Sequence, residues 1–377
     1  MNLESSGIRK INDEASNLDG VISLTIGEPM FNTSPNVIDT AIEALHNNQT
    51  KYPSYEGLQK LRETIVAFEK KSQNIDHSID EVLITQGASG ALFASLGSIL
   101  NPDDEVIVFD PSYIAYLPTI KIFKGVAVII DTTPERFQLS YDKIKQAITS
   151  KTKAIIVNSP NNPTGCIYNE ASLSALTRIM DEHDIYIISD DVYNQLIYTN
   201  EAKFLIQNQK YKSQIIYCQS MSKPYSMTGW RLGYILADKA IINQAKKIQQ
   251  YVAAGLPPFI QLAAAAAFKE DLQPIIVKYK RNRDIALSIL DEHHITYILP
   301  EGAFYLFIDI SASQLNSWDF ARLLLSQSKV AVVPGLVFSQ NADTFVRISF
   351  STDYSNLVEG ITRFATFLSE RTRLNTK

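Results

Sequence analysis

Residues 220–234 read SMSKPYSMTGWRLGY and place two cations, Lys223 and Arg231, in a turn rich in serine and glycine. The run just before this turn, QIIYC (214–218), is largely apolar and is typical of a buried strand. Lysine and arginine are rarely buried unless they are paired, so each of them taken alone would be a solvated surface residue. The position of Lys223 directly behind a buried strand makes the end of that strand a candidate functional site.

Four other short runs have the same apolar character, and helical patterns such as GALFASLGSIL and ASLSALTRIMDEH lie between them. Near-continuous apolar runs are typical of parallel strands that are covered on both faces. Their alternation with helices predicts an α/β fold with a mostly parallel sheet and helices on both sides. The four runs are EVLIT (81–85), EVIVF (105–109), AIIVN (154–158) and IYIIS (185–189).

The last third of the chain has a different pattern. A long amphipathic stretch, IIVKYKRNRDIALSILDEHH, is followed by the short runs AFYLFIDI, KVAVVPG and FVRISFS. This order of elements predicts a smaller α+β domain. We expect a large domain over residues 46–275 and a small domain built from residues 1–45 and 276–377.

Composition excludes several classes of protein. The 377 residues are 45% hydrophobic with a net charge of -5, which allows a large core and gives no general attraction to nucleic acid or to anionic membranes. No apolar tract reaches the roughly 20 residues that a membrane helix needs, and the polar start is not a secretory signal. The two cysteines and five histidines show no disulfide or metal-binding spacing. We therefore expect a cytoplasmic protein without metal, nucleic-acid or membrane partners.

Polar residues follow each predicted strand, at the edge where ligands bind in open parallel sheets. Each of them has an ordinary alternative role, because a glycine and serine turn is most often a helix cap and an asparagine before proline is usually a turn former. Together they predict one site that gathers a glycine turn, an aromatic ring, an amide, an acid with a phenol, and a lysine. The groups are GASG (87–90), Tyr113, Asn162, Asp190 with Tyr193, and Ser220, Ser222 and Lys223.

The combination and its order resemble the class I and II aminotransferases, which are pyridoxal 5′-phosphate (PLP) enzymes of fold type I. The resemblance covers nearly the whole chain and implies a transferase fold with a mostly parallel seven-stranded sheet covered by helices. The matching segments are LTIGEP (24–29), YPSYEGLQKLRE (52–63), NNPTG (161–165), SDDVY (189–193), SMSKPYSMTGWRLGY (220–234), EGAFYLF (301–307) and FVRISFS (345–351).

The resemblance assigns catalytic roles to particular residues. Lys223 would hold PLP as a Schiff base, and its freed amine would then move a proton between the substrate Cα and the cofactor C4′. Asp190 would keep the pyridine nitrogen protonated, which makes the ring an electron sink. Tyr193 and Asn162 would donate hydrogen bonds to the phenolic oxygen, and Tyr113 would stack on the ring.

The resemblance also implies where the phosphate and the substrate bind. Arg347 would grip the substrate α-carboxylate with help from Asn162 and the backbone near Gly27, and its place on the small domain would let substrate binding close the site. Tyr52 would reach the phosphate of a neighbouring subunit, so a homodimer is expected. The cofactor phosphate would be held by Ala88, Ser89, Ser220, Ser222 and Arg231.

One segment departs from the family pattern. Relatives often carry serine or threonine near residues 254–268, where they can reach the partner's phosphate. Here the sequence LPPF (256–259) offers no side-chain donor, so a phosphate contact from this loop is not expected. The five alanines after it predict a close helix-packing surface.

The substrate is less constrained than the cofactor. Three segments, SGIRKIN (6–12), VISLTIGEPMF (21–31) and GASGA (87–91), resemble aminotransferases of lysine and diaminopimelate biosynthesis, which act on N-acetyl-LL-diaminopimelate with 2-oxoglutarate. Aspartate and aromatic aminotransferases share most of these features and remain alternatives. A carbon–sulfur β-lyase is a further alternative, although such relatives tend to carry histidine where this chain has Asn161. A non-catalytic regulator is disfavoured, because no helix-turn-helix fits before Leu24.

Overall fold

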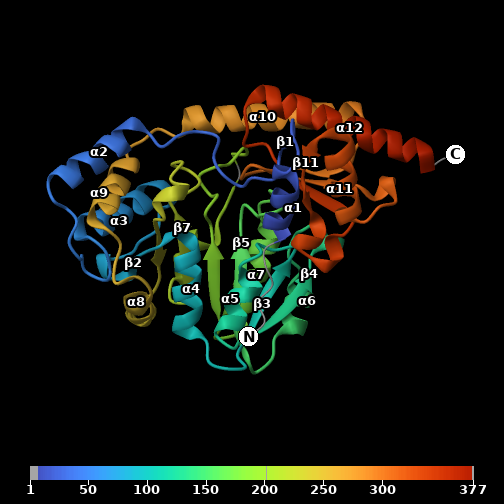
Figure 1. Cartoon of the computed structure of the whole chain (residues 1–377). Helices are drawn as coiled ribbons and strands as arrows, with labels where there is room; N and C mark the ends of the chain where they lie inside the picture. The colour runs from blue at the N-terminus through green and yellow to red at the C-terminus, as the bar shows by residue number, and fades with distance from the viewer. Residues whose placement is uncertain (1–6, 201, 376–377) are drawn as a thin grey trace.

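The computed structural model describes residues 7–200 and 202–375. Within this part the chain forms a large sheet flanked by helices and a smaller group of C-terminal elements beside it, drawn in orange and red in Figure 1. The helices are α1 (Gly7–Ser16), α2 (Pro35–His46), α3 (Gln59–Gln73), α4 (Gly87–Ile99), α5 (Tyr116–Ile122), α6 (Tyr141–Ala147), α7 (Glu170–Glu182), α8 (Lys239–Ala253), α9 (Pro258–Ala267), α10 (Gln273–Glu292), α11 (Ser317–Ser328) and α12 (Tyr354–Asn375).

The large sheet has seven strands in the order β2-β8-β7-β6-β5-β3-β4. β8 runs antiparallel to both of its neighbours and the other strands share one direction, which confirms the predicted mostly parallel α/β sheet. The five predicted strands are all present, and the sequence patterns did not identify the edge strand β4 or the antiparallel β8. The strands are β2 (Val82–Thr85), β3 (Glu105–Asp110), β4 (Val126–Asp131), β5 (Thr152–Asn158), β6 (Tyr186–Asp190), β7 (Ile215–Ser220) and β8 (Gly233–Leu236).

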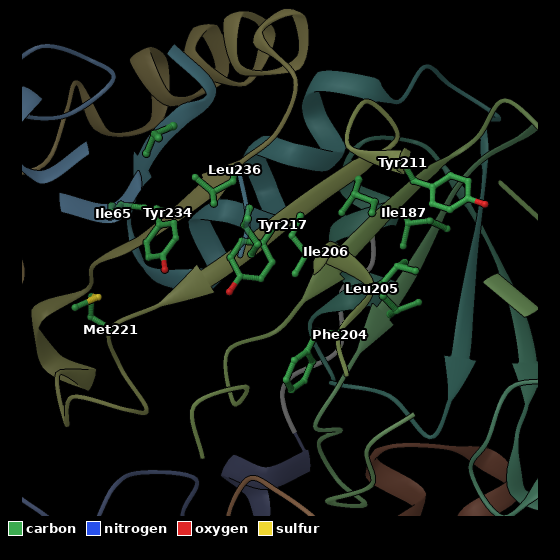
Figure 2. Packing of buried hydrophobic residues seen from close by; sticks show 14 of the residues in the cluster. Ile65, Ile187, Phe204, Leu205, Ile206, Tyr211, Tyr217, Met221, Tyr234 and Leu236 are labelled. Atoms are coloured by element: carbon green, nitrogen blue, oxygen red, sulfur yellow. The ribbon is translucent and has the colours of Figure 1, made fainter. Parts of the chain in front are cut away.

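The central strands are apolar throughout because their side chains pack into two cores, one on each face of the sheet. Ile187 and Ile215 point into a cluster with residues of α3, α7 and α9, part of which Figure 2 shows. Their neighbours Ile188 and Ile216 point to the opposite face, into a cluster with residues of α4, α5 and α8. Side chains alternate between the faces of a strand, so a sheet with helices on both sides needs apolar residues at every position.

The C-terminal part is built on an antiparallel sheet in the order β12-β13-β10-β9, with its own apolar cluster that includes residues of α10, α11 and α12. β1 pairs with β11, and α1 lies among these elements in Figure 1, whereas α2 lies beside α9. The domain boundaries proposed from the sequence stay a prediction. The strands are β1 (Ile22–Ser23), β9 (Tyr297–Ile298), β10 (Tyr305–Asp309), β11 (Val330–Ala331), β12 (Val333–Pro334) and β13 (Phe345–Ser349).

The described residues form neither a membrane-spanning helix nor a metal-binding cluster. None of their helices has both the length and the apolar character that crossing a bilayer requires. No cluster of three or more histidine, cysteine or acidic side chains among them could hold a metal ion. Four of the five alanines in α9 are buried, and α9 packs against α2 and α3, as the sequence predicts for a close helix contact.

Candidate active site

A cavity of about 480 Å³ lies beyond the carboxyl ends of the central strands. It gathers every predicted site residue except Tyr52, together with several that the sequence did not single out. The lining residues are Ile8, Gly27, Glu28, Ala88, Ser89, Tyr113, Asn158, Asn162, Asp190, Val192, Tyr193, Ser220, Ser222, Lys223, Thr228, Gly229, Arg231, Tyr305 and Arg347.

Asn158, the last residue of β5, joins two loops at the floor of this cavity. Its amide nitrogen donates to the backbone oxygen of Asp190 at 2.7 Å, at the end of the neighbouring β6. Its side-chain oxygen accepts from the backbone N–H of Asn162 at 2.8 Å. One buried amide therefore fixes the loop that carries Asn162 relative to the strand end that carries Asp190.

Asp190 is a buried acid with an unpaired acceptor oxygen. Its Oδ2 accepts a hydrogen bond from the Tyr116 hydroxyl at 2.6 Å, whereas its Oδ1 is buried and has no hydrogen-bond partner among the described residues. Burial is the main cause that raises the pKa of Asp190 to about 6. Buried polar atoms are normally hydrogen-bonded, so an unpartnered carboxylate oxygen at the cavity wall fits a cationic N–H group of a ligand.

Lys223 also lines the cavity, in the turn that follows β7. Its Nζ donates to the backbone oxygen of Gly27 at 2.5 Å. Burial, and next the positive charge of Arg347, lower the pKa of the Lys223 amine to about 8. A lysine with a depressed pKa is neutral more often near pH 7, which is the state that attacks carbonyl groups.

The start of α4 and the turn before β8 form a cradle for an anion. The first N–H groups of α4, at Ala88 and Ser89, have no carbonyl partner within the helix. Arg231 has no acid within ion-pair distance among the described residues, and its guanidinium lies over Gly87, where an added Cβ would be 3.0 Å from Nη2. Both groups, with the hydroxyl of Ser222 nearby on the cavity wall, suit a phosphate.

Arg347, on β13, brings a buried guanidinium to the cavity. It is 2% exposed, and the ring of Tyr305 lies 4.4 Å from its central carbon. Nη1 donates to Asn162 Oδ1 at 2.9 Å and Nη2 donates to the Thr25 oxygen at 2.7 Å, whereas Nε has no partner among the described residues. A buried, held arginine fork is well suited to a ligand carboxylate.

Two phenols complete the wall. The Tyr193 hydroxyl lies 2.8 Å from that of Tyr305, and burial raises the pKa of Tyr193 well above its usual value, so this phenol is a hydrogen-bond donor at neutral pH. The ring of Tyr113 meets that of Tyr116 edge-on at 5.6 Å.

The sequence did not identify site residues whose role depends on contacts with distant parts of the chain. Tyr116 and Asp190 are 74 positions apart, and nothing in the local sequence marks this phenol as a partner of the acid. Asn158 and Tyr305 stood inside quoted strand runs but were not assigned roles. Tyr52 is 91% exposed and does not line the cavity, so its role across a subunit interface stays a prediction.

The geometry agrees with the comparisons to known proteins. The family model "Aminotransferase class I and II" matches residues 19–364. The chain belongs to this family. An aspartate aminotransferase of Thermotoga maritima is 35% identical over 94% of this chain and 93% of its own length. A solved structure of an aspartate aminotransferase from that organism superimposes with a TM-score of 0.93 at 34% identity, covering 97% of each chain.

Other relatives with similar sequence identity to this chain are named for different substrates. An aromatic-amino-acid aminotransferase of Thermococcus litoralis is 34% identical over 97% of this chain and 96% of its own length. A probable N-acetyl-LL-diaminopimelate aminotransferase of Bacillus subtilis is 34% identical over 98% of this chain and 94% of its own length. The fold-type I prediction is confirmed, and the protein is a PLP-dependent aminotransferase.

The residues present fit this cofactor. The unpartnered Oδ1 of Asp190 suits the protonated pyridine nitrogen, and the low-pKa amine of Lys223 suits the covalent attachment. The cradle at Gly87 and Arg231 suits the phosphate. When bound, PLP supplies an electron-withdrawing ring that stabilises negative charge at the substrate Cα.

Proposed function

We propose that this aminotransferase moves an amino group between an amino acid and 2-oxoglutarate. The observation that carries the proposal is the meeting of Lys223, Asp190 and Arg347 in one cavity. Asp190 and Arg347 are buried and Lys223 is partly buried, and each has a free atom or a pKa suited to its role. Arg347 binds the substrate α-carboxylate together with Asn162 and the backbone at Gly27. Lys223 Nζ then takes the proton from the substrate Cα.

The remaining wall residues hold the cofactor in this proposal. Asp190 pairs with the pyridine nitrogen, and Tyr116 keeps that carboxylate in place. Tyr193 and Asn162 donate to the phenolic oxygen, and Tyr113 stacks on the ring. The phosphate is held by Ala88, Ser89, Ser220, Ser222 and Arg231.

For the amino donor we propose N-acetyl-LL-diaminopimelate, which would place the enzyme in lysine biosynthesis. The resemblance of residues 6–12, 21–31 and 87–91 supports this choice, and so does the similarity to the Bacillus subtilis relative. The relatives named for aspartate and for aromatic amino acids support the alternative donors equally well. A carbon–sulfur β-lyase is the third reading, and Asn161 argues against it.

A panel of donors assayed with 2-oxoglutarate separates these readings. Glutamate formation from N-acetyl-LL-diaminopimelate should exceed that from aspartate and from phenylalanine by about tenfold or more in kcat/KM, the smallest discrimination that a difference in packing within a substrate pocket gives. A larger kcat/KM for aspartate or phenylalanine would replace the proposed donor. Release of pyruvate and ammonia from a cysteine conjugate without any oxo acid would establish the lyase instead.

We further propose a cytoplasmic homodimer with Tyr52 at the interface. Tyr52 and Tyr251 are 91% and 87% exposed, which is unusual for large aromatic side chains. They belong to adjoining surface, because Pro53 lies against Gly255, just beyond the end of α8. A second copy of the chain would cover both rings.

Light scattering should therefore give twice the mass of one chain. Tyr251→Glu should shift the protein toward monomer, because a charge in an apolar interface is costly, and the monomer should hold PLP more weakly. The matched change Tyr354→Glu, at an exposed tyrosine of α12, should leave the mass unchanged. A wild-type protein that runs as a monomer at micromolar concentration would rule out the dimer.

A further inference from the structure

A carboxyl group lies inside the apolar cluster on the far side of the large sheet from α4. Glu69 of α3 is 2% exposed and follows Leu61 and Ile65 on the buried stripe of that helix. It does not line the cavity, and no ion pair of the described residues includes it. A buried acid without a cation is unfavourable unless hydrogen bonds compensate for its lost hydration, so its presence on an apolar stripe calls for a local cause.

Two tyrosines supply those hydrogen bonds. The hydroxyls of Tyr234 and Tyr217 both donate to Glu69 Oε1, the second at 3.3 Å. Figure 2 shows the two rings near one another, with their hydroxyl oxygens pointing to the same side of the cluster. Burial raises the pKa of Glu69 to about 7, and its Oε2 has no partner among the described residues.

The donation from Tyr217 fixes the direction of the next hydrogen bonds. A phenol has one proton and accepts with its lone pairs. With that proton given to Glu69, the Tyr217 oxygen accepts from Asn194 Nδ2 at 2.8 Å and from Gln219 Nε2 at 3.0 Å. The amide nitrogen of Gln219 therefore faces the tyrosine, and its amide oxygen faces away.

The amide oxygen of Gln219 provides the hydrogen-bond acceptor for the last backbone N–H of β7. Gln219 Oε1 accepts from the backbone N–H of Ser220 at 2.8 Å. The neighbouring strand β6 pairs with β7 only as far as Asp190 and Cys218, so it offers Ser220 no strand carbonyl. The Ser220 hydroxyl in turn donates to the Ser222 hydroxyl at 2.9 Å and accepts from the Ser222 N–H at 3.0 Å.

A second branch reaches the end of β6. Gln219 Nε2 also contacts Asn194 Oδ1 at 2.9 Å and the backbone oxygen of Asp191 at 3.1 Å. Asp191 immediately follows Asp190. The same amide is thus hydrogen-bonded at the ends of both β6 and β7, and the Tyr217 oxygen, whose proton is given to Glu69, adds one further acceptor for Gln219 Nε2 in this orientation.

We propose that Glu69 is a positioning residue for the cofactor: through Tyr217 and Gln219 it fixes the turn that presents the Ser220 and Ser222 hydroxyls to the phosphate. The inference rests on the phosphate-binding role proposed for these serines. Glu69 itself touches neither the cofactor nor the substrate. Its contribution is to give the Tyr217 proton an acceptor, so that the Tyr217 oxygen is free to accept from Gln219 Nε2 and strengthens the set of contacts that holds this amide in place.

The test compares PLP retention by the wild-type holoenzyme and four variants. Glu69→Leu removes the acceptor, Glu69→Gln keeps an amide oxygen as an acceptor, and Tyr217→Phe breaks the chain of hydrogen bonds at its second member. Tyr211→Phe is the matched control, because Tyr211 belongs to the same cluster and its hydroxyl contacts Lys210 near the surface. The rate of PLP release after dilution is followed by visible absorbance, and the thermal midpoint is measured alongside.

Release should be about tenfold or more faster from Glu69→Leu and Tyr217→Phe than from wild type, since each leaves buried polar groups unsatisfied. Glu69→Gln should recover most of the retention, and Tyr211→Phe should match wild type even if its thermal midpoint falls. Wild-type release from both Glu69→Leu and Tyr217→Phe would overturn the inference, and Tyr217→Phe decides alone if Glu69→Leu does not fold. A wild-type protein that fails to bind PLP would instead contradict the cofactor assignment.

Discussion

Lys223→Ala should still fold but lose transamination by at least about 10³-fold. General acid–base catalysis by a positioned side chain contributes roughly 10²–10⁴-fold, and this variant loses both the proton carrier and the covalent anchor. The purified variant should also lack the yellow colour that shifts when an amino donor is added to the wild-type enzyme. Turnover is measured as glutamate formation from 2-oxoglutarate, with PLP in excess so that weaker cofactor binding is not the cause of the loss.

Lys203→Ala is a suitable control for this prediction. Lys203 is an exposed lysine that pairs with Glu170 at 3.5 Å, on the surface and outside the cavity. An exposed ion pair of this kind contributes little to stability, so the control should keep both colour and turnover. Normal turnover by Lys223→Ala would mean that a different group moves the proton, and the mechanism proposed for this site would be wrong.

Asp190→Asn should lower kcat by roughly 10²–10³-fold, the scale on which a single electrostatic partner of the reacting system acts. Asparagine keeps the size of the side chain but removes the charge that holds a proton on the pyridine nitrogen, so the ring withdraws fewer electrons from the substrate Cα. Asp191→Asn is the matched control, because Asp191 is equally buried and lies beside Asp190 but does not line the cavity. Equal rates for the two variants would remove Asp190 from the electron-sink role.

The pH dependence of kcat/KM gives a second test of the role of Asp190. Burial raises the pKa of Asp190 to about 6, so the carboxylate is present above that pH and is lost as the pH falls through it. A cationic pyridine nitrogen beside the acid favours the charged carboxylate, so activity is lost at a lower pH when the cofactor is bound. The wild-type enzyme should therefore lose kcat/KM on the acid side of pH 6, and Asp190→Asn should lack this limb. An unchanged acid limb in Asp190→Asn would assign it to another group.

The sequence predicted the elements of this fold better than the contacts between them. Short apolar runs and the polar groups behind them are local signals, and they located five strands of the sheet and the walls of the cavity. The strand at residues 126–131 was missed because it lies at the sheet edge, where Val126 and Ile129 are about half exposed and the pattern is weaker. Tyr116 and Glu69 were missed because their partners are distant in the chain, at Asp190, Tyr217 and Tyr234.

Three side chains hold the segment that carries Gly27 by its main-chain carbonyls. Arg347 donates to the oxygen of Thr25, Lys223 to that of Gly27, and the Ser351 hydroxyl to that of Glu28. Every amino acid has a backbone carbonyl, so these contacts do not depend on which side chains the segment carries. Glu28 lines the cavity with an exposed side chain, so a substitution there can alter the charge next to the substrate while the carbonyl contacts that hold the segment persist.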